Sequence, residues 1–230
     1  MRFSRFLYLL IFFFLQKPLF SQSFDGHTSG SWLQFSGTNK IHDRWSIPLS
    51  GILRHHDLFE MYDFSFLRTG ASYHFNGSIT LTCGIAYVNS KSYPEVGEAS
   101  VTSQYWLYEE LAWKTKFHRN TLSHRWRLEN RWVRNSGKTN FNNRFRYRLQ
   151  YQRPFSQSTF IKSYNEIFVN LSGSLFNQNR FYLGIGMEVS SSLKVEMGYL
   201  KSHFSTFHHN AVLMAVTFNT TLRATQQRRN

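Results

Sequence analysis

Arginine is the residue type with the clearest chemical potential in this sequence, because it gathers in one segment from Thr121 to Gln152. Read at every second residue, this segment carries arginines on one face and mostly aromatic and aliphatic side chains on the other. The arginine face comprises Arg125, Arg127, Arg131, Arg144, Arg146 and Arg148, with one acid, Glu129. A planar guanidinium binds carboxylate or phosphate groups through two parallel hydrogen bonds, so this face predicts anion recognition.

The elements that must position these arginines are two β-strands. Alternation with a period of two held over residues 121–135 and 141–152 is a strand signal, and the Ser-Gly-Lys loop at 136–138 makes the pair a hairpin. The same alternation in other segments adds Glu110, Glu166 and Arg180 to the polar face. It also adds Lys162, Glu188 and Glu196.

So many cations need partners, because burial of an unpaired charge is costly. One interpretation is a structural ladder of Arg–Glu pairs, braced by Glu129 and Glu166, that fills a plugged barrel. The other is an anion-favouring lumen created by the excess of arginine, either a narrow channel or a barrel that binds small anions. The sequence leaves both open.

Composition favours a membrane β-barrel. The 230 residues include 23 Phe, 12 Tyr and 6 Trp, yet the mean hydropathy is only −0.41. Rings facing lipid and gathered at the membrane interfaces account for this combination. The net charge of +14 fits nucleic acid, anionic membrane surfaces or anionic solutes, and the export predicted below argues against nucleic acid. Cys83 is the single cysteine, so no intramolecular disulfide can form.

Residues 1–22 have the layout of a cleavable signal peptide. Arg2 and Arg5 precede an apolar run from Phe6 to Leu15, which is too short to span a membrane. No later stretch is long and apolar enough for a transmembrane helix. We therefore predict an exported protein with a barrel over residues 23–219 and a short periplasmic tail over 220–230.

Turn chemistry divides the barrel region into eleven legible strand segments. A bacterial single-chain barrel is expected to have an even number, so we predict ten to twelve antiparallel strands, with twelve preferred and the extra strand around residues 22–31. A change of apolar phase predicts a bulge near Arg68 to Gly70, and Asn76-Gly77 predicts a tight hairpin. The segments are 31–39, 44–55, 60–75, 78–88, 101–117, 121–135, 141–152, 159–171, 180–190, 192–200 and 209–218.

Several strings resemble the family catalogued as domain of unknown function 2490. They are ENRWVRN, NRFRYRLQYQ, SYNEIFVN, FNQNRFYLGIGMEVSSSLKVEMGYL and HHNAVLMAVTFN, and the resemblance covers about residues 30–219. It implies a small barrel in the outer membrane of a Gram-negative bacterium, in contact with lipid and lipopolysaccharide, and no established activity. The last strand, ending at Phe218, is also similar to the aromatic-ended signal read by the barrel-assembly machinery, although eleven or so residues follow it.

Two other functions stay open. A membrane-embedded lipid hydrolase would need a Ser and a His close together. The loose candidates are Ser202, His203, Ser205, His208 and His209, or His55 and His56 with Asp57. The His-x-Ser-Asn string of outer-membrane phospholipases is missing, so we predict no enzyme, and we expect no metal and no cofactor. A soluble calycin-like barrel would instead turn the apolar rows inward around a ligand.

Overall fold

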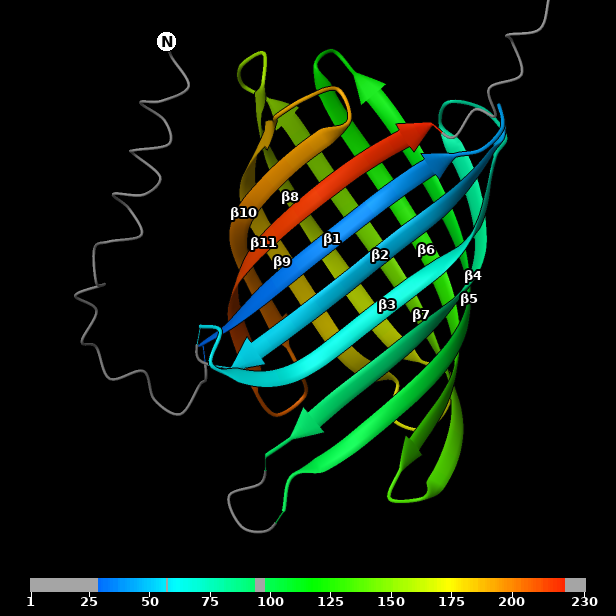
Figure 1. The fold of residues 1–230 in the computed structure, drawn as a ribbon, viewed down its shortest axis with the longest axis vertical. Coiled ribbons are helices and arrows are strands. Elements are labelled where there is room, and N and C mark those ends of the chain that lie inside the picture. The colour runs from blue at the N-terminus through cyan, green and yellow to red at the C-terminus, as the bar shows by residue number, and fades with distance from the viewer. Residues whose placement is uncertain (1–28, 57, 94–97, 222–230) are drawn as a thin grey trace, which may run out of the picture.

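The computed structural model describes residues 29–56, 58–93 and 98–221, which form one closed all-β barrel without helices (Figure 1). No described segment is a helix long and apolar enough to cross a membrane. The strands are β1 (Ser29–Lys40), β2 (Trp45–His56), β3 (Met61–His74), β4 (Ile79–Ser92), β5 (Ser100–Phe117), β6 (Asn120–Asn135), β7 (Lys138–Pro154), β8 (Thr159–Asn170), β9 (Phe176–Glu188), β10 (Leu193–His203) and β11 (His208–Thr221).

The barrel closes through a parallel pair. Every strand runs antiparallel to the next in sequence, but β1 pairs with β11 in parallel, from Ser29 with Asn210 to Lys40 with Thr221. Figure 1 shows β1 between β11 and β2. Closure of eleven strands requires this parallel pair. When each strand is antiparallel to the next and their number is odd, the first and last strands point the same way.

The predicted even strand count is therefore not confirmed for the described residues. Of the segment expected to hold a twelfth strand, residues 29–31 belong to β1 and residues 22–28 lie outside the described part. The predicted signal peptide, residues 1–22, also lies outside it, as do residues 222–230 of the tail. Thr220 and Thr221, assigned to the tail, are the last residues of β11.

The two faces of the strands differ sharply in content. Large apolar side chains point outward and stay exposed: Ile85 and Ile185 are each 62% exposed and Tyr105 is 60% exposed. Most of the charged side chains of β6 and β7 point inward and are buried, with Glu129 at 0%. This arrangement is the reverse of the one that a soluble ligand-binding barrel requires.

The predicted β6–β7 hairpin is confirmed. Its register runs from Thr121 opposite Gln152 to Asn135 opposite Lys138. The connecting residues Ser136 and Gly137 have φ values of 48° and 79°. Positive φ at both central positions is the type I′ turn, whose twist matches that of the flanking strands.

The hairpin predicted at Asn76-Gly77 is confirmed, but its turn is not the type that Asn-Gly favours. Residues 75–78 connect β3 to β4, and neither Asn76 nor Gly77 has a positive φ. The Asn76 side-chain oxygen instead accepts hydrogen bonds from the backbone N–H groups of Ser78 and Ile79, both at 2.8 Å. An Asx turn has replaced the tight turn.

The prediction of a bulge near Arg68 to Gly70 was wrong. β3 pairs with β4 without a shift from Phe64 to His74. The irregularity is at the other end of β3, where the register against β2 shifts between Arg54 and His55. The apparent change of phase arose because Phe66 points into the lumen, where it is 9% exposed.

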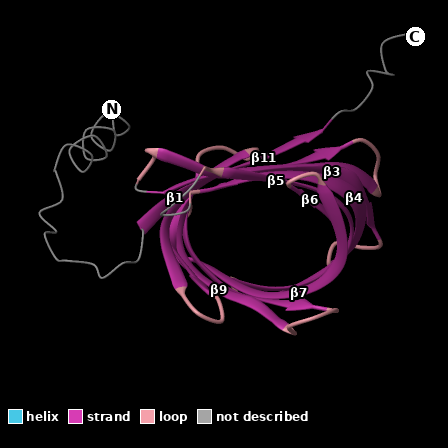
Figure 2. Cartoon of the chain, turned by 90° about the horizontal axis from the view of Figure 1, so that it is seen from below, coloured by secondary structure: helices cyan, strands magenta, loops and turns pink. Residues whose placement is uncertain are grey.

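Two apolar clusters line the lumen. The first contains Phe66, Ala86, Val88 and Trp106. The second contains Trp32, Tyr164, Tyr182, Leu200, Ala211, Leu213 and Ala215. Figure 2 shows the strands as an elongated ring around this interior. Gly184 and Gly198 pair across β9 and β10, and the Tyr182 ring lies so close to both that a Cβ atom at either position would meet it.

Candidate anion site in the barrel lumen

Three glutamates and three arginines form a closed cycle of ion pairs in the lumen, which we call the Arg–Glu ring. Its order is Glu110, Arg127, Glu129, Arg146, Glu166 and Arg125, and back to Glu110. The six residues come from β5, β6, β7 and β8, because inward-facing positions of neighbouring strands lie side by side.

Each glutamate of the ring also holds one further arginine. Arg68 Nη1 lies 3.3 Å from Glu110 Oε2. Arg144 Nε donates to Glu129 Oε2 at 2.8 Å, and its Nη2 lies 2.6 Å from the same oxygen. Arg148 donates to Glu166 Oε2 through Nε at 3.1 Å and Nη2 at 2.6 Å. We call the ring with these three arginines the Arg–Glu network.

The geometry of the network explains how it tolerates burial. Glu129 and Glu166 are 0% exposed, and each is surrounded by three guanidinium groups. Arg144 and Arg148 each direct Nε and Nη2 at a single carboxylate oxygen, and hydrogen bonds between ionised groups are stronger than neutral ones. Six guanidinium groups face three carboxylates, so the network carries a net charge of +3.

Two more lumen arginines, Arg131 and Arg180, make no ion pair among the described residues. Arg131 is 8% exposed, and its buried Nε has no hydrogen-bond partner. Arg180 is 9% exposed and donates only one long hydrogen bond, of 3.4 Å, from Nε to Ser202 Oγ. These two arginines, called the unpaired arginines below, raise the excess of positive charge in the lumen to +5.

Aromatic rings support the arginine side chains. The guanidinium carbon of Arg180 lies 4.7 Å from the centre of the Trp32 ring and 4.9 Å from that of Phe168. That of Arg146 lies 4.2 Å from the Phe168 ring. Such contacts stabilise a cation electrostatically and hold its plane in one orientation.

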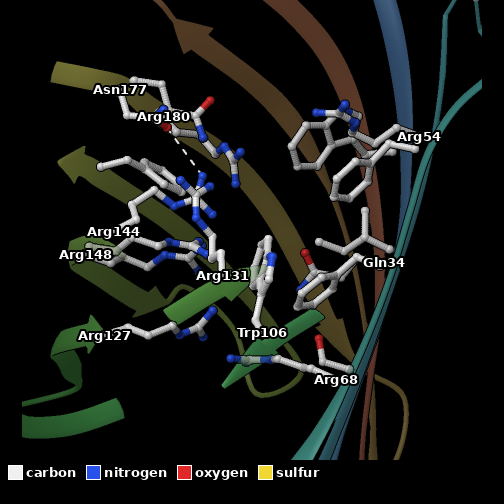
Figure 3. A pocket seen from close by; sticks show the side chains of 18 of the residues that line it. Gln34, Arg54, Arg68, Trp106, Arg127, Arg131, Arg144, Arg148, Asn177 and Arg180 are labelled. Atoms are coloured by element: carbon white, nitrogen blue, oxygen red, sulfur yellow. Dashed lines mark hydrogen bonds between the residues drawn. The ribbon is translucent and has the colours of Figure 1, made fainter. Parts of the chain in front are cut away.

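The arginines border a cavity of about 320 Å³ (Figure 3). In Figure 3, Arg144, Arg148 and Arg180 lie across the cavity from Gln34 and Arg54. The Asn177 side-chain oxygen accepts a hydrogen bond from Arg144 Nη1 at 3.4 Å. A cavity of this size suits a small ligand, and its surplus of donors and positive charge suits an anion.

All the residues proposed from the sequence for this site lie together in the lumen. They are Glu110, Arg125, Arg127, Glu129, Arg131, Arg144, Arg146, Arg148, Glu166 and Arg180. Lys162 and Glu196 form a separate pair at 2.6 Å. Glu188 pairs with Lys194 and is exposed.

Sequence reasoning missed several lining residues. Arg54 pairs with Asp63 at 2.9 Å and lies over the rings of Trp32 and Phe64. Arg68, near the wrongly predicted bulge, joins the network. Trp106 and Glu110 are four residues apart on β5, so alternation places both on the inward face. This spacing could have identified Trp106 as a lining residue from the sequence.

The residues considered for a hydrolase do not assemble into a triad among the described residues. Ser202 Oγ accepts a hydrogen bond from Arg180 Nε, and Nε2 of His209, which is opposite Ser202 on β11, has no hydrogen-bond partner. The His203 and His208 rings are 6.0 Å apart, and His56 Nε2 lies 3.8 Å from Asp63. Asp57 lies outside the described residues.

The family model described as "Protein of unknown function (DUF2490)" matches residues 29–212, and the chain therefore belongs to this family. The match covers all strands from β1 to β10 and the start of β11. No curated protein matches the sequence.

Proposed function

We propose that this member of the DUF2490 family is an outer-membrane β-barrel whose lumen binds small anions. The observation that carries the proposal is the pair of unpaired arginines, Arg131 and Arg180, beside a network that already holds a net charge of +3. A buried cation without a counter-ion is costly, and an anionic ligand would remove that cost.

A bilayer location is supported by the direction of the side chains. Exposed apolar residues face outward on every strand, while the arginines and glutamates of the Arg–Glu network face the lumen. Water would make this arrangement unfavourable, whereas lipid makes it favourable. Export is supported by the signal-like residues 1–22. An outer-membrane location is supported by the family resemblance.

Binding is favoured over free conduction because large side chains fill much of the lumen. Tyr108, Tyr182 and Phe168 are each no more than 1% exposed, as are Glu129 and Glu166. An open pore would leave such inward side chains in contact with water.

The first test is envelope fractionation combined with heat modifiability of the detergent-extracted protein on a gel. We expect the protein in the outer-membrane fraction, with a mobility shift between unboiled and boiled samples. A soluble periplasmic protein without a shift would contradict the membrane location.

The second test is calorimetric titration of the extracted full-length protein with acetate and with inorganic phosphate. We expect saturable binding of at least one anion, lost in the double variant Arg131→Gln with Arg180→Gln. Arg134→Gln is the matched control, because Arg134 is exposed and lies three positions from Arg131 on the opposite face of β6. Equal binding by the double variant and the wild type would contradict the proposed site.

A further inference from the structure

The cavity has two unlike walls. Arginines from β6, β7 and β9 form what we call the cationic wall, which comprises Arg125, Arg127, Arg131, Arg144, Arg146, Arg148 and Arg180. Side chains from β1, β2, β3 and β5 form the opposite wall. We call its apolar members Trp32, Ile52, Phe64, Phe66 and Trp106 the aromatic wall, and they lie among Gln34, Ser50, Arg54, Arg68 and Gln104. The ligand therefore meets a row of arginines on one side and a mixed surface of rings and polar groups on the other.

The aromatic wall is well ordered by its own packing. The ring centres of Phe66 and Trp106 are 5.5 Å apart, and both side chains are buried. Trp106 Nε1 donates to Gln104 Oε1 at 2.9 Å, which fixes the plane of the indole. A fixed aromatic surface favours a flat partner, because stacking requires little loss of side-chain freedom.

Unused hydrogen-bond donors remain on both walls. Trp32 is 3% exposed, and its Nε1 has no hydrogen-bond partner, like Nε of Arg131 on the cationic wall. Buried donors of this kind are rare in folded proteins unless a ligand or water occupies the site. Their positions favour a ligand with acceptors as well as an apolar body.

We propose that the ligand is an amphipathic organic anion, with an anionic group held by the unpaired arginines and a planar ring held against Trp32, Phe66 and Trp106. This inference rests on the proposed anion binding and adds the class of ligand. The 320 Å³ cavity accommodates a small ring compound but not an oligomer.

The test titrates the full-length protein, in an uncharged detergent, with four probes. These are 2-naphthoate, its neutral isostere 2-naphthamide, acetate and inorganic phosphate. We expect 2-naphthoate to bind on the order of a hundredfold more tightly than 2-naphthamide, because the amide leaves the buried arginines unpaired. We expect it to bind on the order of tenfold more tightly than acetate, through stacking and apolar burial.

Variants separate the two walls. Trp106→Leu should weaken 2-naphthoate binding several-fold and leave acetate binding unchanged, because acetate has no ring to stack. Trp132→Leu is the control for adsorption to the outer surface, since Trp132 faces outward and is 42% exposed. It should leave both affinities unchanged.

The possible failures are distinguishable. Equal affinity for 2-naphthoate and acetate, both lost in the Arg131→Gln with Arg180→Gln variant, would overturn the ligand class and leave anion binding intact. Equal affinity for naphthoate and naphthamide, with acetate binding still lost in that variant, would likewise overturn the ligand class alone. Binding of no anion would overturn both proposals.

Discussion

The Arg–Glu network and the unpaired arginines place the same side chain in two different settings within one lumen. In the network, every guanidinium lies within 3.7 Å of a carboxylate. Arg131 and Arg180 are equally buried and make no ion pair among the residues described. Paired arginines can stabilise the fold, whereas burial of an unpaired arginine is costly. Under the proposed function, the comparison separates the arginines that hold the barrel together from those that would bind a ligand.

The largest expected effect comes from Glu129→Ala. The variant would leave Arg127, Arg144 and Arg146 without a carboxylate that they now share. Breaking a buried pair by removing one partner costs about 3–5 kcal/mol, so the barrel should lose its heat-modifiable band at a much lower temperature. The control is Glu188→Ala, which removes an exposed pair with Lys194 and should cost no more than about 1 kcal/mol. Similar losses of stability in both variants would contradict the view that the buried network stabilises the barrel more than an exposed ion pair does.

A double-mutant cycle measures the network itself. Arg144→Gln and Glu129→Gln, alone and together, should give a coupling energy of about 1–3 kcal/mol in urea unfolding, because the contact is a short, buried ion pair. Independent effects, with no coupling, would mean that the network adds nothing beyond filling space.

Substitution of the unpaired arginines should not lower the stability of the barrel, unlike substitution of the network residues. Arg131→Gln with Arg180→Gln removes two buried charges that have no partner, so the free energy of unfolding should stay within about 1 kcal/mol of the wild type or rise. The same variant should lose acetate binding. A loss of stability as large as that of Glu129→Ala would assign these arginines to the scaffold.

The smallest expected effect distinguishes the charge of Arg180 from the planar shape of its guanidinium group. Arg180→Lys retains the positive charge but loses the planar group that lies between the rings of Trp32 and Phe168. Anion affinity should fall by roughly 1 kcal/mol, less than in Arg180→Gln, in the same titration. Equal losses in the two variants would show that the plane matters as much as the charge.

The sequence was sufficient for most of the strands and for the face that the arginines of β6 and β7 occupy, because alternation with a period of two is a local property. It was insufficient where a residue's environment depends on distant strands. The change of apolar phase in residues 60–75 suggested a bulge, whereas Phe66 points into the lumen and packs against Trp106 of β5. The pairing of Arg54 with Asp63 depends on the register shift between β2 and β3, which no local signal specifies.

The described residues, which form eleven strands, do not confirm the even strand number that we predicted. The even-number rule generalises from bacterial barrels in which the first and last strands are antiparallel, and strand parity cannot be read from any single segment. Membership of the DUF2490 family agreed with the sequence resemblance, but the cyclic order of the Arg–Glu ring emerged only from the three-dimensional neighbours.

The parallel pairing of β1 with β11, which we call the seam, also constrains how the barrel assembles. Every other strand pair joins neighbours in sequence, and such hairpins can form within microseconds once their residues are available. The contact between Ser36 and Thr217, at 3.1 Å, joins residues 181 positions apart. Closing so long a loop has the greatest entropic cost, so β1 and β11 should meet last, after the rest of the sheet has curled. The seam is then the place where a partly assembled barrel stays open longest, and where a chaperone could hold it.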